Sequence, residues 1–175
     1  PCRAEMPSIQ KLYEKTQGVA RQTALIPNAA DFEHFSRAPV AQPLSHLPRP
    51  IVGYYGAIAD WFDIEMIRAA AMARPNWQFV LIGSTYGANV APLQRLPNVH
   101  LLGEKPYQDL PAYLHQFDVA CIPFKLNPLT EATNPVKFYE YLCAGKPIVA
   151  TALPELQPYP EFHYPVHTPA DFVPQ

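Results

Sequence analysis

The stretch Asn134–Thr151, NPVKFYEYLCAGKPIVAT, contains the signals that decide the fold. Asparagine is a strong helix N-cap and proline is favoured in the first helical turn, so Asn134 and Pro135 predict the start of a helix. Gly145 predicts its end, because glycine commonly follows a helix C-terminus. The apolar run from Pro147 to Thr151 then predicts a buried strand. This stretch is therefore one helix followed by one strand.

Outward from this stretch, the same alternation extends over residues 51–153. The expected strands are Ile51–Gly56, Trp77–Ile82, Asn98–Leu102 and Asp118–Phe124, and the expected helices are 60–73, capped by Asp60, and 106–116, with Pro106 in its first turn. Apolar strands that alternate with helices are typical of a parallel sheet covered on both faces. We therefore predict an α/β, Rossmann-like parallel sheet with right-handed crossovers.

Outside residues 51–153 the signals are weaker. They predict a helix over 9–17 and short strands over 23–26 and 164–167. Proline is the compositional outlier, with 22 of 175 residues, and it gathers at 39–50 and 154–174. Proline fixes φ and has no backbone N–H, so these two clusters predict extended connectors on either side of the alternating segment.

Composition also limits the function. The net charge is −2 and only 16% of residues are charged, which disfavours a nucleic-acid-binding module. Cys2, Cys121 and Cys143 are too widely spaced for a disulfide framework or a metal knuckle, and they favour a reducing compartment. The six histidines form no metal-ligand pattern, and no apolar run is long enough for a transmembrane helix. The start at Pro1 and the lack of a signal peptide suggest a fragment of a longer protein.

Ligands of parallel α/β sheets bind at the carboxyl ends of the strands. Those ends here are Gly56-Ala57, Gly83-Ser84, Gly103-Glu104-Lys105 and Phe124-Lys125. Neither a dinucleotide fingerprint nor a P-loop is present. The glycines are most simply tight turns at strand ends, and the alternative is that the backbone opens there to admit a phosphate or a sugar.

Lys137 and Glu140 follow the expected helix start at a spacing of three. A cation is unfavourable in the first helical turn, so Lys137 fits that position well if an anion binds there. Glu140 lies on the same helix face, where it can pair with Lys137 or accept from a ribose hydroxyl. On spacing alone, an ordinary surface pair worth about 0.2–0.5 kcal/mol is the simpler interpretation.

Four segments, in order along the chain, resemble motifs of the C-terminal domain of group 1 glycosyltransferases, which have the GT-B fold. They are the entry motif Ile26–Asp31 with Phe35, the first strand and loop Gly53–Asp63, the segment Asn98–Gly103 with Leu110-Pro111, and the donor-site helix and strand Asn134–Thr151. The resemblance covers about residues 25–154, and the last motif is the most specific.

The resemblance implies one half of a two-domain enzyme. Residues 26–175 would be the donor-binding domain, truncated at its C-terminus, and residues 1–25 would be a linker or the tail of a missing N-terminal acceptor domain. The implied activity is retaining, hexosyltransferase-like transfer of a sugar from a UDP- or GDP-type nucleotide-sugar to a glycan or lipid-linked acceptor in polysaccharide biosynthesis. It needs no metal or other cofactor, and this fragment alone would be inactive. The implied location is the cytoplasm. The resemblance also allows the parent protein to associate peripherally with the inner face of the membrane.

The resemblance also assigns roles to residues. Glu140 would contact the donor ribose, the amides from Asn134 to Lys137 would lie near the diphosphate, and the backbone at Glu104–Pro106 would hold the base. The whole expected donor site consists of Gly56, Ala57, Gly83, Lys105, Lys125, Asn134, Val136, Lys137 and Glu140. No catalytic residue is assigned, because none of these fits a general base.

Three positions depart from the family pattern. Many relatives carry a second glutamate eight positions before the ribose glutamate, where this chain has Ala132, with Glu131 one position further back. Ala57 and Phe62 stand where many relatives carry an arginine and a lysine. We therefore expect Lys137, with Lys125, to balance the diphosphate. The alternative function is a Rossmann-type nucleotide-binding or interaction module without transferase activity.

Overall fold

The computed structural model describes residue 24 and residues 26–172. The expected helix over 9–17 lies outside these residues. Of the short strand expected over 23–26, residues 24 and 26 are described, and neither is in a strand. Of the three cysteines, Cys121 and Cys143 are described, and both are free thiols.

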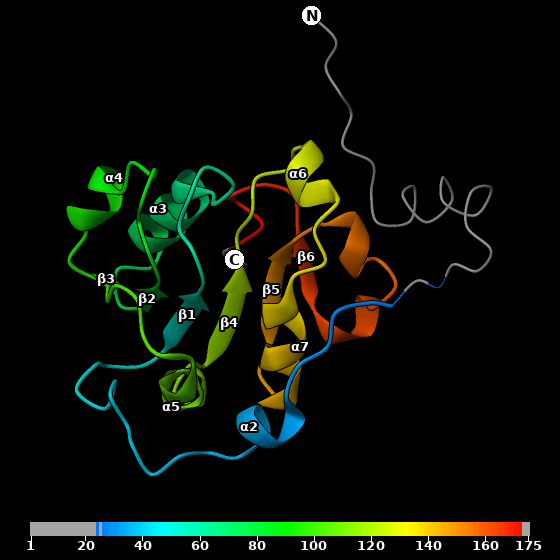
Figure 1. Ribbon diagram of the computed structural model, residues 1–175. Helices are drawn as coiled ribbons and strands as arrows, with labels where there is room; N and C mark the ends of the chain where they lie inside the picture. The colour runs from blue at the N-terminus through cyan, green and yellow to red at the C-terminus, as the bar shows by residue number, and fades with distance from the viewer. Residues whose placement is uncertain (1–23, 25, 173–175) are drawn as a thin grey trace, which may run out of the picture.

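A six-stranded sheet in the order β3-β2-β1-β4-β5-β6 forms the centre of the molecule (Figure 1). The strands are β1 (Ile51–Tyr55), β2 (Gln78–Ile82), β3 (Val99–Leu101), β4 (Val119–Ile122), β5 (Ile148–Thr151) and β6 (Tyr164–Val166). Every neighbouring pair is parallel. The prediction of a Rossmann-like parallel sheet is confirmed, and each of these six strands lies within two residues of a predicted one.

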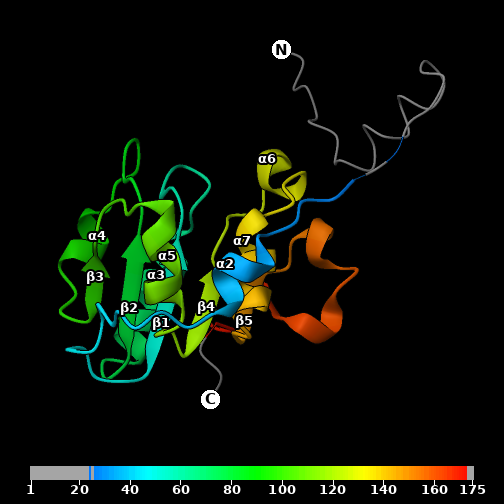
Figure 2. The same cartoon turned by 60° about the horizontal axis from the view of Figure 1, so that its bottom comes forward.

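Helices cover both faces of this sheet. They are α2 (Phe32–Ser36), α3 (Ile64–Ala73), α4 (Ala91–Gln94), α5 (Leu110–Leu114), α6 (Pro128–Glu131) and α7 (Val136–Cys143), with 3-10 turns at Tyr107–Asp109, Pro154–Leu156 and Pro160–Phe162. Helix α3 packs on α4 and β2, whereas α7 packs on β5 and α2. The chain moves outward from β1 in opposite directions on the two sides, so right-handed crossovers place α3 and α7 on opposite faces. Figure 2 shows α2, α5 and α7 together in front of the strands.

The core lies between these layers. All five residues of β1 and all five of β2 are buried, which is why both sequences are almost entirely apolar. Large aromatic side chains from the strands and helices fill the core, among them Tyr54, Phe79, Phe117, Phe138 and Tyr141, each at most 1% exposed. Burial of such rings supplies most of the driving force for folding.

The start of α3 differs from the prediction. Asp60 does not cap this helix; the cap is Asp63, whose Oδ1 accepts from the amide of Met66 at 2.9 Å. The reason is that the preceding loop pairs with the end of β4 through an antiparallel bridge between Phe62 and Phe124. This pairing occupies the backbone around residue 62 and delays the helix by one turn.

The start of α7 also differs in detail. Asn134 was the expected N-cap, but the observed N-cap is Pro135, which makes no side-chain cap hydrogen bond, so Asn134 lies one position before the helix cap. The Asn134 carbonyl accepts from Asn28 Nδ2 at 2.7 Å, and its own Nδ2 donates to Tyr139 Oη at 3.1 Å. The Asn134 amide therefore holds the approach to the helix rather than its first turn. The helix expected over 106–116 is shorter than predicted, with a 3-10 turn before α5, and the short helices α4 and α6 were not predicted.

Candidate functional site

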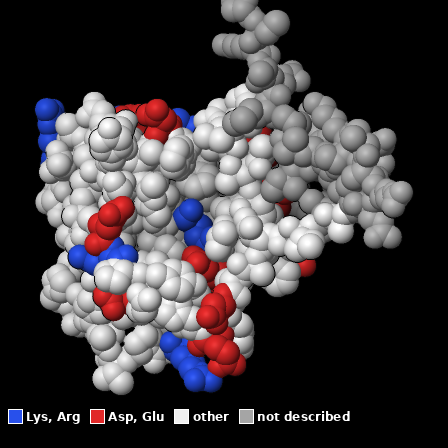
Figure 3. Space-filling view, in the orientation of Figure 1, with Lys and Arg blue, Asp and Glu red and all other residues white. Residues whose placement is uncertain are grey.

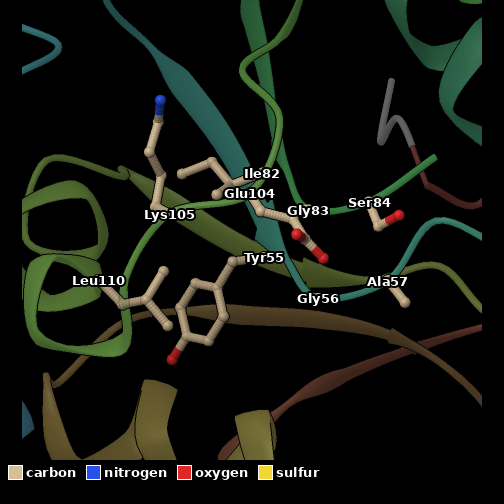
Figure 4. Close-up of a pocket in the computed structure, with 9 residues that line it drawn as sticks. All are labelled: Tyr55, Gly56, Ala57, Ile82, Gly83, Ser84, Glu104, Lys105 and Leu110. Atoms are coloured by element: carbon tan, nitrogen blue, oxygen red, sulfur yellow. The ribbon is translucent and has the colours of Figure 1, made fainter.

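A cavity of about 260 Å³ opens at the carboxyl ends of β1, β2 and β3. Figure 4 shows the side chains that line it: Tyr55, Gly56, Ala57, Ile82, Gly83, Ser84, Glu104, Lys105 and Leu110. The cavity lies at the sheet edge where ligands of parallel α/β folds bind. It brings together Gly56, Ala57, Gly83 and Lys105, four of the nine predicted donor-site residues.

Two glycines let the backbone turns above this cavity pack tightly. Gly83 has φ +146° and a Cβ placed on it would lie 2.0 Å from the carbonyl oxygen of Gly56. Gly56 itself has φ +133° and donates its amide to the carbonyl of Ile82 at 2.8 Å. Only glycine satisfies both the backbone angle and the close approach. The turns are therefore structural in origin, and they also leave backbone exposed to the cavity.

Lys137 extends from the first turn of α7 to the turn at Gly56. A Cβ on Gly56 would lie 3.2 Å from the Lys137 ammonium. That ammonium lies 5.4 Å from the centre of the Tyr54 ring and 5.0 Å from that of Phe124, a cation–π arrangement. Burial lowers the pKa of Lys137 from 10.5 to about 8, and nearby Glu140 opposes the shift. Sequence reasoning found this lysine but missed the rings that hold it.

The ammonium of Lys137 has no anionic partner. It takes part in none of the ion pairs among the described residues, which join other side chains. The pair with Glu140 that the spacing suggested does not form at ion-pair distance within this part of the chain. Partial burial of a cation without a counter-ion costs free energy, and a bound anion would offset that cost.

A second cavity, of about 400 Å³, lies on the other side of Lys137. Its lining consists of Trp61, Phe124, Leu129, Thr130, Thr133, Asn134, Pro135, Val136 and Lys137. Asn134 is 7% exposed, and its Oδ1 is buried with no hydrogen-bond donor near it among the described residues. Aromatic faces, threonine hydroxyls and an unpaired amide oxygen suit a polyhydroxylated ligand such as a sugar.

Glu140 lies behind the first cavity and is 6% exposed. Its Oε2 accepts a hydrogen bond from Tyr55 Oη at 2.8 Å, and Tyr55 lines the cavity. Burial raises the pKa of Glu140, while the Tyr55 hydrogen bond and the charges of Lys137 and His34 oppose the rise. Glu140 is therefore a carboxylate held in place by a hydrogen bond, and a single side chain, that of Tyr55, connects it to the cavity.

The three lysines expected around one diphosphate do not converge. Lys105 lines the first cavity, and in Figure 4 its ammonium points away from the glycine turns. Lys125 is exposed, lines neither cavity and donates to the carbonyl of Asp60 at 2.9 Å. Lys137 is thus the lysine that the described structure places between the two cavities.

The short helix α6 settles where Glu131 and Ala132 lie. Glu131 is the last residue of α6 and is exposed, and Ala132 is the residue that caps its end. Neither lines the two cavities. No bulge returns Glu131 to the position of the family's second glutamate, and the second cavity has no carboxylate among its lining residues.

Other features of the described residues bear on function. They contain no group of three or more His, Cys, Asp or Glu side chains placed to hold a metal ion. No helix in this part of the chain is both long and apolar enough to span a bilayer. On the face shown in Figure 3, basic and acidic side chains lie in small mixed groups. Over its described residues, that face does not present the continuous basic surface typical of nucleic-acid-binding proteins.

Comparison with known proteins places these features in a family. A family model described as glycosyl transferases group 1 matches residues 49–172. TuaH of Bacillus subtilis (strain 168), whose name gives it a role as a glycosyltransferase in teichuronic acid biosynthesis, is 33% identical over 158 residues, which are 85% of this chain and 40% of that protein.

Solved structures show the same arrangement of strands and helices. Sucrose-phosphate synthase from Thermosynechococcus elongatus superposes with a TM-score of 0.68 at 25% identity, over 93% of this chain and 45% of that one. The pneumococcal O-GlcNAc transferase GtfA, solved in complex with UDP and GlcNAc, has a TM-score of 0.57 at 14% identity, over 93% of this chain and 34% of that one. The chain thus spans less than half the length of each of these relatives.

Proposed function

This chain belongs to the glycosyl transferases group 1 family, as its motifs led us to expect, and on that premise we propose that it is the donor-binding domain of a two-domain sugar transferase. The whole protein would move a sugar from a nucleoside-diphosphate sugar to a glycan or lipid-linked acceptor. The UDP bound in the pneumococcal relative supports a UDP-type donor, with a GDP-type donor as the other choice. The role in polysaccharide biosynthesis that TuaH's name gives it supports an acceptor of that class.

The observation that carries the proposal is the half-buried ammonium of Lys137, which has no carboxylate partner among the described residues. It lies in the first turn of α7, where the helix dipole and the unpaired amides of Val136 and Lys137 also favour negative charge. Gly56 has no side chain, and this lets the end of the Lys137 side chain lie directly against the turn that lines the first cavity. A diphosphate placed here would supply the missing counter-ion.

Each of the two cavities would hold one part of the nucleotide-sugar donor. The base would lie in the first cavity, near the backbone of Glu104 and Lys105, with the ribose directed toward Glu140 behind Tyr55. The sugar would lie in the second cavity, against Trp61. Lys137 lies at the boundary of the two, where a diphosphate would join them.

The chemistry that this chain supplies is electrostatic. In transfer, the bond between the anomeric carbon and the diphosphate oxygen breaks, and its electron pair stays on the departing nucleoside diphosphate. Lys137 and the first amides of α7 would stabilise that negative charge as it develops. The acceptor hydroxyl forms the new bond at the anomeric carbon and loses its proton. We assign no general base within this chain, and the neutralisation of charge by protein groups in place of a metal remains a prediction.

The domain arrangement is part of the proposal. Residues 26–175 would bind the donor, and residues 1–25 would lead from an N-terminal acceptor domain. This chain alone would then not transfer sugar, and the parent protein would act in the cytoplasm with peripheral access to the membrane. Sugar turnover by the isolated 175-residue chain would contradict this division. An inverted anomeric configuration, read by NMR from the product of the full-length protein, would contradict retention.

Calorimetric titration of this chain with UDP, GDP, uridine and guanosine tests donor binding. We expect one diphosphate to bind, and Lys137→Met to weaken it about 30-fold while leaving the matching nucleoside unaffected, because a buried charge-assisted contact is lost. The matched control is Lys146→Met, which removes a lysine that lines neither cavity and leaves both affinities unchanged. If the unmodified chain binds neither diphosphate, the proposed function is wrong, and of the alternative the interaction module without transferase activity stands.

A further inference from the structure

We propose that Tyr55 is a positioning residue for donor recognition: its hydroxyl fixes Glu140 so that the free oxygen of that carboxylate accepts from a ribose hydroxyl. This inference rests on the proposed function, because it assumes that a nucleoside diphosphate occupies the first cavity. Tyr55 was predicted only as part of a buried strand, and nothing in its sequence context distinguishes it from its neighbour Tyr54.

The contact between the two side chains is short and buried. Tyr55 is 4% exposed and Glu140 is 6% exposed, and the distance from Tyr55 Oη to Glu140 Oε2 is 2.8 Å. Among the described residues, Tyr55 is the only hydrogen-bond donor to this carboxylate, so Oε1 accepts no hydrogen bond there. A buried carboxylate normally saturates both oxygens. One oxygen is thus held by the protein and the other is left for a ligand.

Three contacts with two aromatic residues, Phe35 and Tyr141, fix the position of Tyr55. Its ring stacks on Phe35 with 6.4 Å between the ring centres, and it meets Tyr141 edge to face at 5.1 Å. Its amide donates to Tyr141 Oη at 3.3 Å. The hydroxyl therefore has little freedom to leave the carboxylate, as positioning of a binding group requires.

The position of Tyr55 also connects the pair to the cavity. Tyr55 lines the first cavity, whereas Glu140, on α7, does not. A glutamate on a helix has several rotamers, and burial alone does not choose among them. The hydrogen bond from β1 selects one, which orients the carboxylate before a nucleotide arrives.

The experiment compares ribonucleotides with analogues that lack the ribose hydroxyls. UDP, GDP and their 2′,3′-dideoxy forms are titrated by calorimetry into the full chain and into Tyr55→Phe, which keeps the packed ring and removes only the hydroxyl. We expect the ribonucleotide that binds to lose about tenfold in affinity and its dideoxy analogue to lose none. Adding Tyr55→Phe to Glu140→Gln should cause no further loss, because the two side chains act as one unit.

Tyr54→Phe is the matched control. Tyr54 is the adjacent buried tyrosine, and its hydroxyl donates to the carbonyl of Ala57 at 2.9 Å, away from Glu140. Any weakening that this variant causes should be the same for the ribonucleotide and its dideoxy analogue.

The outcomes separate the inference from the proposed function. An equal loss for both nucleotides in Tyr55→Phe would overturn the positioning role and reduce the hydrogen bond to a packing contact. Equal binding of ribonucleotide and dideoxy analogue by the unmodified chain would overturn the ribose role of Glu140, and the inference with it, while donor binding stands. Absence of any nucleotide binding would instead overturn the proposed function.

Discussion

Lys137 and Lys146 lie at opposite edges of the same sheet and have opposite surroundings. Lys146, just before β5, donates to the carbonyls of His115 and Phe117 at 2.7 and 2.9 Å. The Lys137 side chain, at the start of α7, makes no hydrogen bond or ion pair within the described residues, and its ammonium lies over the faces of Tyr54 and Phe124. Burial lowers the pKa of both lysines, so the difference between them lies in their partners.

The same contrast extends to the rest of each edge. At the amino edge, Arg49 pairs with Asp118, whose Oδ2 also accepts from the amide of Ile51 at 2.7 Å. At the carboxyl edge, Asn134 Oδ1 and the Lys137 ammonium are left without polar partners among the described residues. The polar groups named at the amino edge bond to one another within the fold, whereas the two named at the carboxyl edge remain unpaired and available to a ligand. Polar groups that the fold leaves unpaired are thus a marker of the binding edge.

The largest predicted effect is on the free energy of unfolding, and it compares one glycine at each of the two edges. A Cβ at Gly83 would lie 2.0 Å from the Gly56 carbonyl, whereas a Cβ at Gly145, past the end of α7, meets nothing within 4 Å. We expect Gly83→Ala to lower the free energy of unfolding by about 3 kcal/mol or more, and Gly145→Ala by about 1 kcal/mol from its positive φ alone. Urea denaturation measures both.

Equal losses for the two glycine variants would show that the turns at the carboxyl edge relax freely. That result would remove the case for a rigid backbone around the anion position. The Gly145 variant is the internal control, since its φ of +63° carries strain without a close contact.

The two lysines should differ in the sign of their effect on stability. The pKa of Lys137 is lowered in the folded state to about 8, so its charged form is unfavourable there, and its contribution to stability is lost as the pH falls through 8. At pH 7, Lys137→Met should therefore raise the free energy of unfolding by about 1–2 kcal/mol. Lys146→Met should lower it by about 1–3 kcal/mol, because two carbonyls lose their donor. If both variants lowered the free energy of unfolding, the conclusion that the two lysines have opposite roles in stability would be wrong.

The smallest effect is a proton taken up on binding. Because the pKa of Lys137 is about 8 without ligand, about half of its amines are neutral at pH 8, and a bound diphosphate would raise that pKa. Calorimetry at pH 8 in two buffers of different ionisation enthalpy should show uptake of about half a proton per diphosphate. Affinity should fall as the pH rises above 8. Uptake that persists in Lys137→Met would assign the proton to another group.

Much of the fold could be predicted from the sequence, because the positions of the strands, their parallel arrangement and the longer helices follow from apolar runs and from punctuation by glycine and proline. The edge that holds the site followed from the same pattern, and Lys137 was found from its position in a helix start. The neighbours of Lys137 could not be predicted. Phe124 lies next to Lys137 at the end of β4, which a bridge joins to the loop before α3, a pairing without local signal.

The same limit explains the other differences. Asp60 has the chemistry of a cap, and only the tertiary pairing of its loop moves the cap to Asp63. Lys105 and Lys125 follow strand ends as predicted, but the Lys105 ammonium points away from the glycine turns in Figure 4, and that of Lys125 donates to the carbonyl of Asp60. Sequence spacing places a residue at an edge, whereas the direction of its side chain depends on contacts made far along the chain.

The hydrogen bond from Asn28 to the Asn134 carbonyl has a mechanical meaning. It fastens the chain that leads into the domain to the turn before Lys137, and α2 adds a second fastening on the same helix. A pull on the chain ahead of residue 28 would load this turn before it reached any strand. One side-chain amide therefore links the direction of the incoming chain to the start of α7. A force on that chain would displace the backbone next to Lys137, where we propose that the phosphate binds.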